Sequence, residues 1–365
     1  MATVKISEQT YKKLNEIAGE LRSRLGRPVS VDEAIDYAMR QNKAKPSDYA
    51  GSGTLNKFYY FYLLTVFRLY VSIVAASIIG RYKLDFILER ETSFGAGGLA
   101  SLFTGKPIIL EIIGPRYSRY SASRAKKILY YTETMLRNWV DRRKCISVPA
   151  GVNLDLFKLD EEKGKDVRSS LGFHDAFVLG YVGSFQPWHG IDTLLNAARA
   201  ARDKIPDLRL LLIGPNYEAY VTAAKELGVS DIAKFLGPMD YDLIPGYTNA
   251  CDVMLALYEP KKDQLREKYG IGWPIKILEY MACGKPTVST NVEPVPKIIT
   301  SPEYGYLLEP GDSIALSQLI ISMRSNHDRL VKIGKNGRDL VVENYSWARV
   351  ARTISELMKE AGNIS

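Results

Sequence analysis

Two charged side chains lie three positions apart in the stretch PIKILEYMACGKPTV, residues 274–288. Lys276 and Glu279 fall on one side of a predicted helix, near its N-terminal turn. At that place a lysine can contact a diphosphate, and a carboxylate can accept hydrogen bonds from ribose hydroxyls. A Lys–Glu pair on a helix surface is the simpler structural explanation, so the pattern needs support from the rest of the chain.

A glycine-containing loop is a second candidate, in the stretch GYVGSFQPWHGID, residues 180–192. A predicted strand ends at Gly183 and a helix begins near Gly190. Backbone N–H groups of such a loop can approach an anion closely, and the N-terminus of the following helix adds positive potential. Glycine at a strand–helix turn also occurs for geometric reasons alone. Two further strand ends carry glycine, at Ile213-Gly214-Pro215 and at Phe235-Leu236-Gly237-Pro238.

Short apolar strands and helices alternate regularly after residue 176, and they must position these candidates. The predicted strands are Phe177–Gly183, Leu208–Ile213, Ile232–Phe235, Val253–Ala256, Thr287–Ser289 and Gly305–Leu308, and a final helix spans Trp347–Lys359. This alternation predicts a doubly wound α/β domain with a parallel sheet. Such sheets bind ligands at the carboxyl ends of their strands, where the candidates above are expected.

Residues 57–150 predict a second, smaller parallel sheet. The expected elements are a strand at Lys83–Leu88, a helix at Gly95–Phe103, a strand at Ile108–Ile112 and a strand–helix step in ILYYTETMLRNW. The apolar stretch 58–80 has two interpretations. It is a buried helix of this domain, because Arg68 near its middle would cost about 2.5–3.5 kcal/mol at the centre of a bilayer, or it presents a face to a membrane surface.

The composition points to an anionic partner in a reducing compartment. Net charge is +8 and the pI is about 9.1, which suits nucleic acid, a phosphorylated substrate or an acidic membrane without choosing among them. Three cysteines and three histidines are scattered along the chain, so neither a metal site nor a disulfide framework is predicted. The N-terminus has no apolar segment of the signal-peptide type. We therefore expect a cytoplasmic location, with peripheral membrane contact as the alternative.

Residues 1–44 show a strand–helix–helix pattern that is too small to bury its own apolar faces, so we expect it to dimerise. The order of elements and the string GRPVSVDEAIDYAM resemble the ribbon-helix-helix DNA-binding modules. In that family outward strand side chains enter the major groove, and here these would be Thr3, Lys5 and Ser7. A dimerisation arm without DNA contact is the alternative.

Five segments in register resemble the retaining GT-B glycosyltransferases of family four, the group 1 glycosyltransferases. The segments are ISVPAGVNLDLF, VGSFQPWHGIDTLLNAA, KFLGPMDYDLIPGYTNACDVMLALY, PIKILEYMACGKPTV and ENYSWARVARTISEL, within residues 145–360. The resemblance implies two Rossmann-like domains and sugar transfer from a nucleoside diphosphate sugar with retention of configuration. It implies no metal or other cofactor, and it leaves the acceptor unknown.

The resemblance also implies roles for individual residues. Glu279 would bind the donor ribose, Lys276 and the loop at Gly183–Ser184 would contact the diphosphate, and backbone near Phe235 and Gly237 would meet the base. His189 and Lys276 would support the leaving group, and are the candidate catalytic residues.

The chain departs from the family pattern in three places, of which the second and third favour a rival interpretation. Many members carry Arg and Lys in the glycine loop, where this chain has Ser184 and His189. The first acid of the family's E-x7-E motif is replaced by Ile271, and the nearest acids upstream are Glu259, Asp263 and Glu267. The first domain lacks its initial strands. A catalytically inactive, glycosyltransferase-like DNA-binding or scaffold protein is the rival.

The sequence thus predicts five parts and a homodimer. They are a ribbon-helix-helix-like module at 1–44, a linker at 45–56, a reduced acceptor-side domain at 57–150, a nucleotide-sugar-binding domain at 151–345 and a closing helix at 346–365. Gly51-Ser52-Gly53 in the linker has a second interpretation, as the glycine loop near the start of GT-B enzymes.

Overall fold

The computed structural model describes residues 54–90 and 95–362, with the side chains of 54–67 excepted. The chain separates into two compact units, Met1–Phe67 and Arg68–Ser365. The module predicted at 1–44, its contacts through Thr3, Lys5 and Ser7, and nearly all of the 45–56 linker lie outside the described residues. These interpretations stay predictions.

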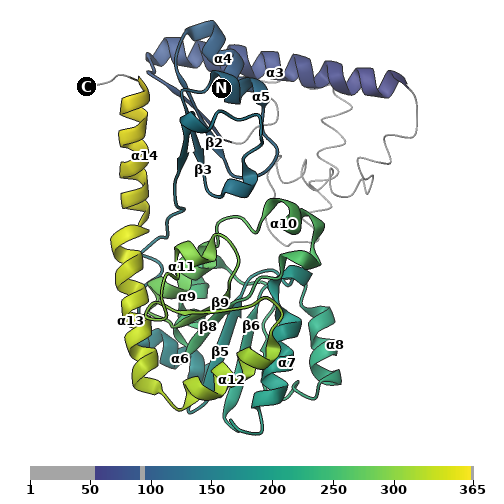
Figure 1. The fold of residues 1–365 in the computed structure, drawn as a ribbon, viewed down its shortest axis with the longest axis vertical. Coiled ribbons are helices and arrows are strands. Elements are labelled where there is room, and N and C mark those ends of the chain that lie inside the picture. The colour runs from purple at the N-terminus through teal and green to yellow at the C-terminus, as the bar shows by residue number, and fades with distance from the viewer. Residues whose placement is uncertain (1–53, 91–94, 363–365) are drawn as a thin grey trace. The chain divides into compact units, whose positions relative to one another are not determined.

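The first Rossmann-like domain contains a four-stranded parallel sheet with the order β1-β2-β3-β4. Its strands are β1 (Ile87–Arg90), β2 (Ile108–Ile112), β3 (Lys127–Tyr130) and β4 (Cys145–Ser147), and its helices are α4 (Ala96–Thr104) and α5 (Arg119–Arg124). Strand β2 is buried along its whole length, as expected for a parallel strand covered on both faces. The predicted α/β class is therefore confirmed for this small sheet (Figure 1).

Helix α3 (Thr54–Tyr82) precedes this sheet, and its second half is less buried than the sequence predicted. The Ser72 hydroxyl contacts Arg68 O at 2.6 Å and Ala96 O at 3.1 Å, which joins α3 to the start of α4. Between residues 68 and 82 only Ser72 and Ile79 are buried, so the interpretation as a buried helix is wrong for this half. In the part of the chain that the structure describes, no helix has the length and apolar character needed to cross a membrane.

The helix expected in the second half of ILYYTETMLRNW, residues 128–139, does not form. Residues 131–144 instead contain two short 3-10 turns, η2 (Glu133–Met135) and η3 (Arg142–Lys144). The buried Tyr117 hydroxyl donates to Met135 O at 3.2 Å and accepts from Arg137 N at 2.7 Å. Because that hydroxyl occupies backbone groups that helical hydrogen bonds would use, a tertiary contact overrides the local helical pattern.

The second domain is built on a six-stranded parallel sheet with the order β10-β9-β8-β5-β6-β7. Its strands are β5 (Phe177–Val182), β6 (Leu208–Ile213), β7 (Ala233–Phe235), β8 (Val253–Ala256), β9 (Thr287–Thr290) and β10 (Tyr306–Leu308), each within two residues of its predicted bounds. The chain runs outward from β5 to β7 and then returns to pair β8 with β5. The direction of winding therefore changes between β5 and β8, which is where such sheets open a ligand crevice.

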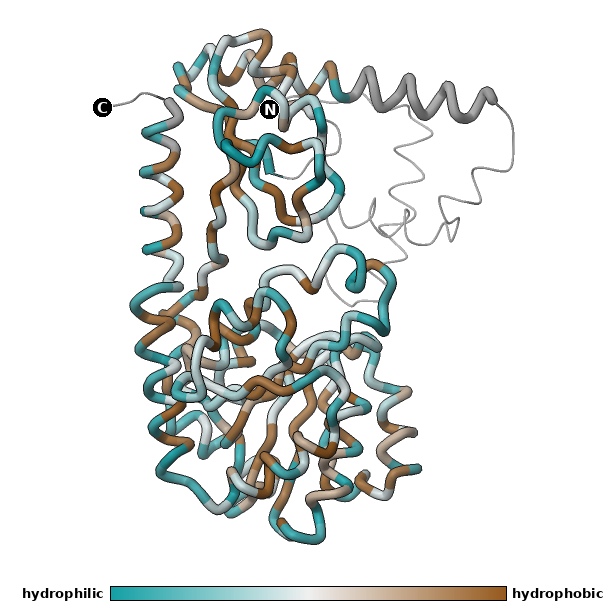
Figure 2. Tube along the Cα trace, viewed as in Figure 1, coloured by the Kyte–Doolittle hydropathy of each residue, from teal (hydrophilic) through white to brown (hydrophobic). Residues whose placement is uncertain are grey.

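Helices cover both faces of this sheet (Figure 1). The helices that follow β4 in the chain are α6 (Glu161–Leu171), α7 (Ile191–Ala201), α8 (Glu218–Glu226), α9 (Ile244–Asn249), α10 (Gln264–Tyr269), α11 (Ile275–Ala282), α12 (Ser313–Arg324), α13 (His327–Asn344) and α14 (Trp347–Gly362). Short 3-10 turns lie between them at η4 (Pro187–His189), η5 (Tyr241–Leu243), η6 (Pro260–Lys262) and η7 (Val295–Lys297). Figure 2 shows apolar residues along the central strands of this domain.

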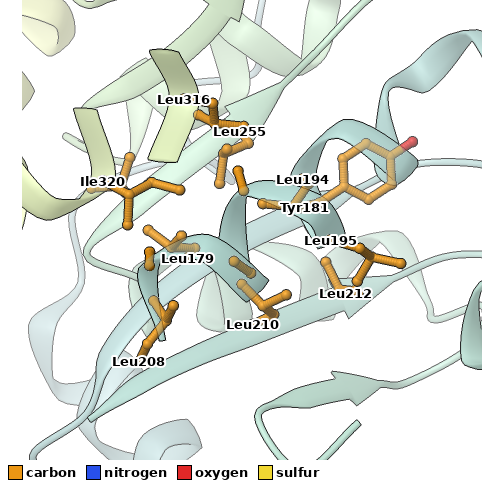
Figure 3. Close-up of a cluster of buried hydrophobic side chains, with 14 of the residues drawn as sticks. Leu179, Tyr181, Leu194, Leu195, Leu208, Leu210, Leu212, Leu255, Leu316 and Ile320 are labelled. Carbon is orange, nitrogen blue, oxygen red and sulfur yellow. The ribbon is translucent and has the colours of Figure 1, made fainter. Parts of the chain in front are cut away.

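Alternate residues of each central strand enter different cores. Leu179 and Leu210 pack with residues of α7 and α12, in the cluster drawn in Figure 3. Val178 and Leu211 belong to the opposite core, together with residues of α9, α11 and α13. Helix α11, which carries Lys276 and Glu279, is thus fixed to the sheet by Ile277, Leu278 and Met281, all fully buried.

Helix α14 returns to the first domain. Ile354 and Leu357 pack against the core that contains Ile109 and Leu129, and Lys127 Nζ lies 4.0 Å from Glu360 Oε2. The ion pair is exposed and contributes little. The apolar packing is therefore what holds α14 to the first sheet.

Two helical glycines give a matched test of the packing of α13 against the end of α11. A Cβ on Gly334 of α13 would lie 2.1 Å from Gly284 O, at the end of α11, whereas a Cβ on Gly80 of α3 would have no atom within 4 Å. We expect Gly334→Ala to lower the free energy of unfolding by about 1–3 kcal/mol. Gly80→Ala should raise that free energy by up to about 1 kcal/mol, because alanine is the better helix former. Urea unfolding of both variants checks this, and equal effects would contradict the packing.

Candidate functional site

The loop after β5 meets the N-terminal turn of α11 at the carboxyl edge of the sheet. Gly183 has φ +151°, and its N–H donates to Ile213 O at 2.9 Å. A Cβ at this position would lie 2.5 Å from Lys276 Nζ and 2.9 Å from the Tyr181 hydroxyl. Any side chain here would displace Lys276, so the glycine is needed for the close approach of these two elements.

Lys276 is half-buried among aromatic rings. Its Nζ lies 4.8 Å from the centroid of the Tyr181 ring and 5.8 Å from that of Tyr258. It makes no ion pair with any carboxylate of the described residues. Burial lowers the pKa of the ammonium group to about 8, and Glu279 acts in the opposite direction. The site therefore contains a cation whose charge is stabilised mainly by ring faces and is open to an anionic ligand.

Glu279 lies one turn further along α11 and faces Tyr241. The Tyr241 hydroxyl donates to Glu279 Oε1 at 2.5 Å. Burial raises the pKa of the carboxyl group, while the hydrogen bond from Tyr241 and the charge of Lys276 lower it. The tyrosine orients the carboxylate, and Oε2 remains as an acceptor for a ligand hydroxyl.

His189 lies in η4 and is buried against the glycine loop. Its Nδ1 contacts Ser184 O, and because a carbonyl can only accept, Nδ1 carries the proton. Burial, together with the nearby charges of Lys276 and Arg266, lowers the pKa of the ring to about 3, while the hydrogen bond to Ser184 O acts in the opposite direction. The ring is therefore neutral at pH 7 with Nε2 as an acceptor. This geometry favours positioning of the loop, and the catalytic role of His189 stays a prediction.

The residues predicted at the base-binding end lie two strands away from β5. Gly214 N donates to Gly237 O at 2.7 Å, which links the loop after β6 to the loop after β7. The Phe235 ring stacks on Tyr217 with centroids 6.0 Å apart. Backbone hydrogen bonds thus join the glycine-containing loops after β5, β6 and β7 into one edge.

The acid that the family motif would place at 271 has no substitute nearby. Ile271 is buried in the apolar core. Glu259, just after β8, is buried, but Oε1 accepts from the Thr193 hydroxyl at 2.5 Å and Oε2 pairs with Lys262 Nζ at 2.9 Å. Asp263 accepts from two N–H groups at the start of α10, and Glu267 is exposed. Of these three acids, none presents a free buried carboxylate at the site.

Sequence reasoning missed the aromatic surroundings of the candidate residues. Tyr181 and Tyr258 contact Lys276, Tyr241 contacts Glu279, and Arg266 of α10 lies over the Trp188 ring at 4.7 Å from its centroid. The position of Tyr181 and Tyr258 at the ends of β5 and β8 was a usable signal. The contact of Arg266 with Trp188 depends on tertiary packing, so no pattern in the sequence could have predicted it.

The state of His189 gives a direct test of the loop geometry. We expect the ring to stay neutral, with its proton on Nδ1, from pH 8 down to pH 5, because burial disfavours the charged form. Nitrogen-15 NMR of the imidazole, assigned by comparison with His189→Gln, measures this. A titration of the ring within that range would contradict the buried geometry.

A family model, Glycosyl transferases group 1, matches residues 163–340. The GDP-mannose-dependent alpha-(1-6)-phosphatidylinositol monomannoside mannosyltransferase of Mycolicibacterium smegmatis is 25% identical over 213 residues, covering 58% of this chain and 55% of that protein. The N-acetyl-alpha-D-glucosaminyl L-malate synthase of Bacillus anthracis is 30% identical over 141 residues, covering 38% of this chain and 34% of that protein. The match to the mannosyltransferase thus spans about half of that protein's length.

Solved structures share the architecture. Alr3699/HepE of Anabaena in complex with UDP has a TM-score of 0.66 at 20% identity, covering 79% of this chain and 82% of that chain. A glycosyltransferase from Rickettsia africae ESF-5 has a TM-score of 0.69 at 20% identity, covering 99% and 97%. The parallel sheets and these likenesses agree that the chain has a GT-B fold with two Rossmann-like domains. Residues 163–340 are similar to the family of the glycosyl transferases group 1.

Proposed function

We propose that this protein transfers a sugar from a nucleoside diphosphate sugar to an acceptor, with retention of configuration. The observation that carries the proposal is the half-buried Lys276 beside the Gly183 loop, which has no carboxylate partner among the residues that the structure describes. Helix α11 has no acidic residue in its first turn and no side-chain cap, so its N-terminus also favours an anion. A diphosphate placed there would meet the ammonium group and the positive end of the helix dipole.

The proposed reaction uses these groups to stabilise the leaving diphosphate. The bond between the anomeric carbon and the phosphate oxygen breaks, the acceptor oxygen bonds to the same carbon on the same face, and the acceptor proton passes to the departing phosphate. Lys276 and loop amides near Ser184 balance the developing charge, and Glu279 holds the ribose. No metal or other cofactor has a part in this proposal.

The relatives support a nucleotide sugar as the donor. One neighbouring structure is that of HepE with UDP and glucose, and the mycobacterial relative is GDP-mannose-dependent. In this chain the base would lie near Phe235 and Gly237, beyond the diphosphate along the same edge. The rival is an inactive scaffold protein, which is favoured by the replacement at Ile271 and by the four-stranded first sheet.

Binding of UDP and GDP at different pH values tests the donor site. An anion prefers the charged form of Lys276, so affinity should be constant from pH 7 to about 8 and then fall, by up to about tenfold per pH unit. Lys276→Met should bind weakly at every pH. Glu279→Gln should weaken binding and move the fall in affinity to lower pH, because the charge of Glu279 raises the pKa of Lys276. Isothermal titration calorimetry measures all three.

The same samples separate the enzyme from the rival. Slow sugar release from UDP-glucose or GDP-mannose, lost in Lys276→Met, is expected of an enzyme. Binding of the nucleotide without any sugar release, alone or with candidate acceptors, would support the inactive protein. No binding of UDP or GDP would contradict the proposed donor site.

We further infer that the acceptor is presented at an anionic membrane surface. The exposed face of α3 carries Leu69, Tyr70 and Ile73, each about half exposed, while its packed face carries Arg68 and Ser72. Residues 51–150 hold 15 Lys and Arg against 6 Asp and Glu, whereas residues 151–365 hold 25 against 28. An apolar helix face on a strongly basic domain suits anionic lipid. The phosphatidylinositol mannoside named for one relative is such a lipid.

Vesicle binding tests this surface. The wild-type protein should sediment with phosphatidylglycerol vesicles and not with phosphatidylcholine vesicles, and added salt should weaken the binding. Leu69→Glu with Ile73→Glu should abolish sedimentation, while Ile314→Glu, at a 70% exposed apolar residue of α12, should not. Nucleotide affinity should be the same in all three proteins. If the α3 variant and Ile314→Glu change sedimentation equally, the proposal that this face of α3 binds the membrane is contradicted. If the wild-type protein is a dimer and the α3 variant is not, the face binds a second copy of the chain instead.

A further inference from the structure

The glycine loop supplies no positive charge of its own. The loop from Gly183 to Gly190 contains no Lys or Arg, and its polar side chains include Ser184 and His189. Ser184 is uncharged, and the buried His189 ring already uses its Nδ1 proton on Ser184 O. Of the residues discussed so far, Lys276 alone would face the two phosphates of a donor. A second cation would have to come from another element.

Arg266 reaches this loop from α10, ten residues before Lys276. Its guanidinium carbon lies 4.7 Å from the centroid of the Trp188 ring. Trp188 contacts His189 with centroids 3.9 Å apart and stacks on Tyr258 at 5.9 Å. Lys276 Nζ lies over that same Tyr258 ring at 5.8 Å. The two cations therefore border one aromatic cluster at the carboxyl ends of β5 and β8.

Helix α10 holds Arg266 in place, and the guanidinium is not neutralised by a carboxylate of the described residues. Asp263 accepts from the backbone N–H groups of Leu265 and Arg266, both at 2.9 Å, which fixes the start of α10. Arg266 makes no ion pair within the described ranges 54–90 and 95–362. The side chain is partly exposed, so water can hydrate the guanidinium until a ligand replaces that water. Both Arg266 and Lys276 act on His189 as nearby positive charges.

We propose that Arg266 binds the diphosphate of the donor from the side of Trp188 and replaces the cation that the glycine loop lacks. A guanidinium can donate two parallel hydrogen bonds to phosphate oxygens. As the bond from the anomeric carbon to the phosphate oxygen breaks, the negative charge that collects on that oxygen is shared between Arg266 and Lys276. The guanidinium stays protonated throughout, and Trp188 is its positioning residue. This inference rests on the proposed function.

Substitution of Arg266 tests its role with a readout specific to the second phosphate. Arg266→Gln should weaken binding of UDP or GDP about tenfold or more, with binding of UMP or GMP changed much less. Sugar release from the corresponding donor should fall about 10²- to 10³-fold. Lys268→Gln is the matched control, since Lys268 lies on the same helix with its Nζ over the Tyr269 ring, 5.3 Å from the centroid. It should change neither quantity.

A cation introduced into the glycine loop should partly restore the activity that Arg266→Gln loses. Ser184→Arg introduced into Arg266→Gln should recover part of the sugar release, because it returns a cation to the loop position. Trp188→Leu should weaken diphosphate binding in the wild-type background and have no further effect in Arg266→Gln.

The outcomes separate this inference from the proposed function. If the wild-type protein binds a nucleoside diphosphate and releases sugar but Arg266→Gln is unchanged, the role of Arg266 is refuted and the function stands. Equal losses for the monophosphate and the diphosphate would also refute it, since they indicate damage to the fold. If the wild-type protein binds no nucleoside diphosphate, both fail.

Discussion

The candidate site depends on keeping a lysine charged where little water reaches it. Removing an ammonium group from water is costly unless other charges or dipoles replace the water. Around Lys276 the replacement comes chiefly from the faces of Tyr181 and Tyr258, and the cost remains visible in the lowered pKa. The hydroxyl of Tyr280 accepts from Val182 N at 2.9 Å and donates to Val182 O at 3.0 Å, which ties α11 to the end of β5. The arrangement is rigid before any ligand arrives.

Topology explains why residues so distant in sequence meet there. Strands β5 and β8 are neighbours in the sheet although more than 70 residues separate them. All six strands are parallel, so their carboxyl ends share one edge. Gly183 follows β5, Tyr258 follows β8, and α11 begins at the same edge. The loops after β6 and β7 extend that edge through the hydrogen bond from Gly214 to Gly237.

The sequence was informative where a local pattern and the tertiary structure agree. Strands β6 and β8 have their predicted bounds, because each is a short apolar run that is buried on both faces. The second half of ILYYTETMLRNW was mispredicted because the Tyr117 hydroxyl, distant in sequence, occupies the backbone at Met135 and Arg137. Helix α3 was correctly predicted as a helix, but the prediction that it is buried was wrong for residues 68–82, since burial depends on what covers the helix.

Within the site, the sequence identified Lys276, Glu279 and the loop from spacing and family resemblance. It could not show that His189 is inward-facing and neutral, because that follows from burial and from its contact with Ser184 O. Arg266 was unpredictable for a similar reason. Its place over Trp188 is set by the path of the chain between β8 and α11, and no local periodicity encodes that path.

The position of the second cation has a physical rationale. An arginine in the glycine loop would lie beside the half-buried Lys276, whose Nζ already comes within 2.5 Å of where a Gly183 Cβ would be. In the absence of a ligand, two like charges at such close range in a poorly hydrated site repel strongly. On α10 the guanidinium keeps part of its hydration and lies across the Trp188 ring, so the repulsion is screened until an anion enters between the two cations. Because the second cation lies on α10 and not in the loop, the repulsion between the two cations is weaker when no ligand is bound. Both cations can still stabilise a bound diphosphate.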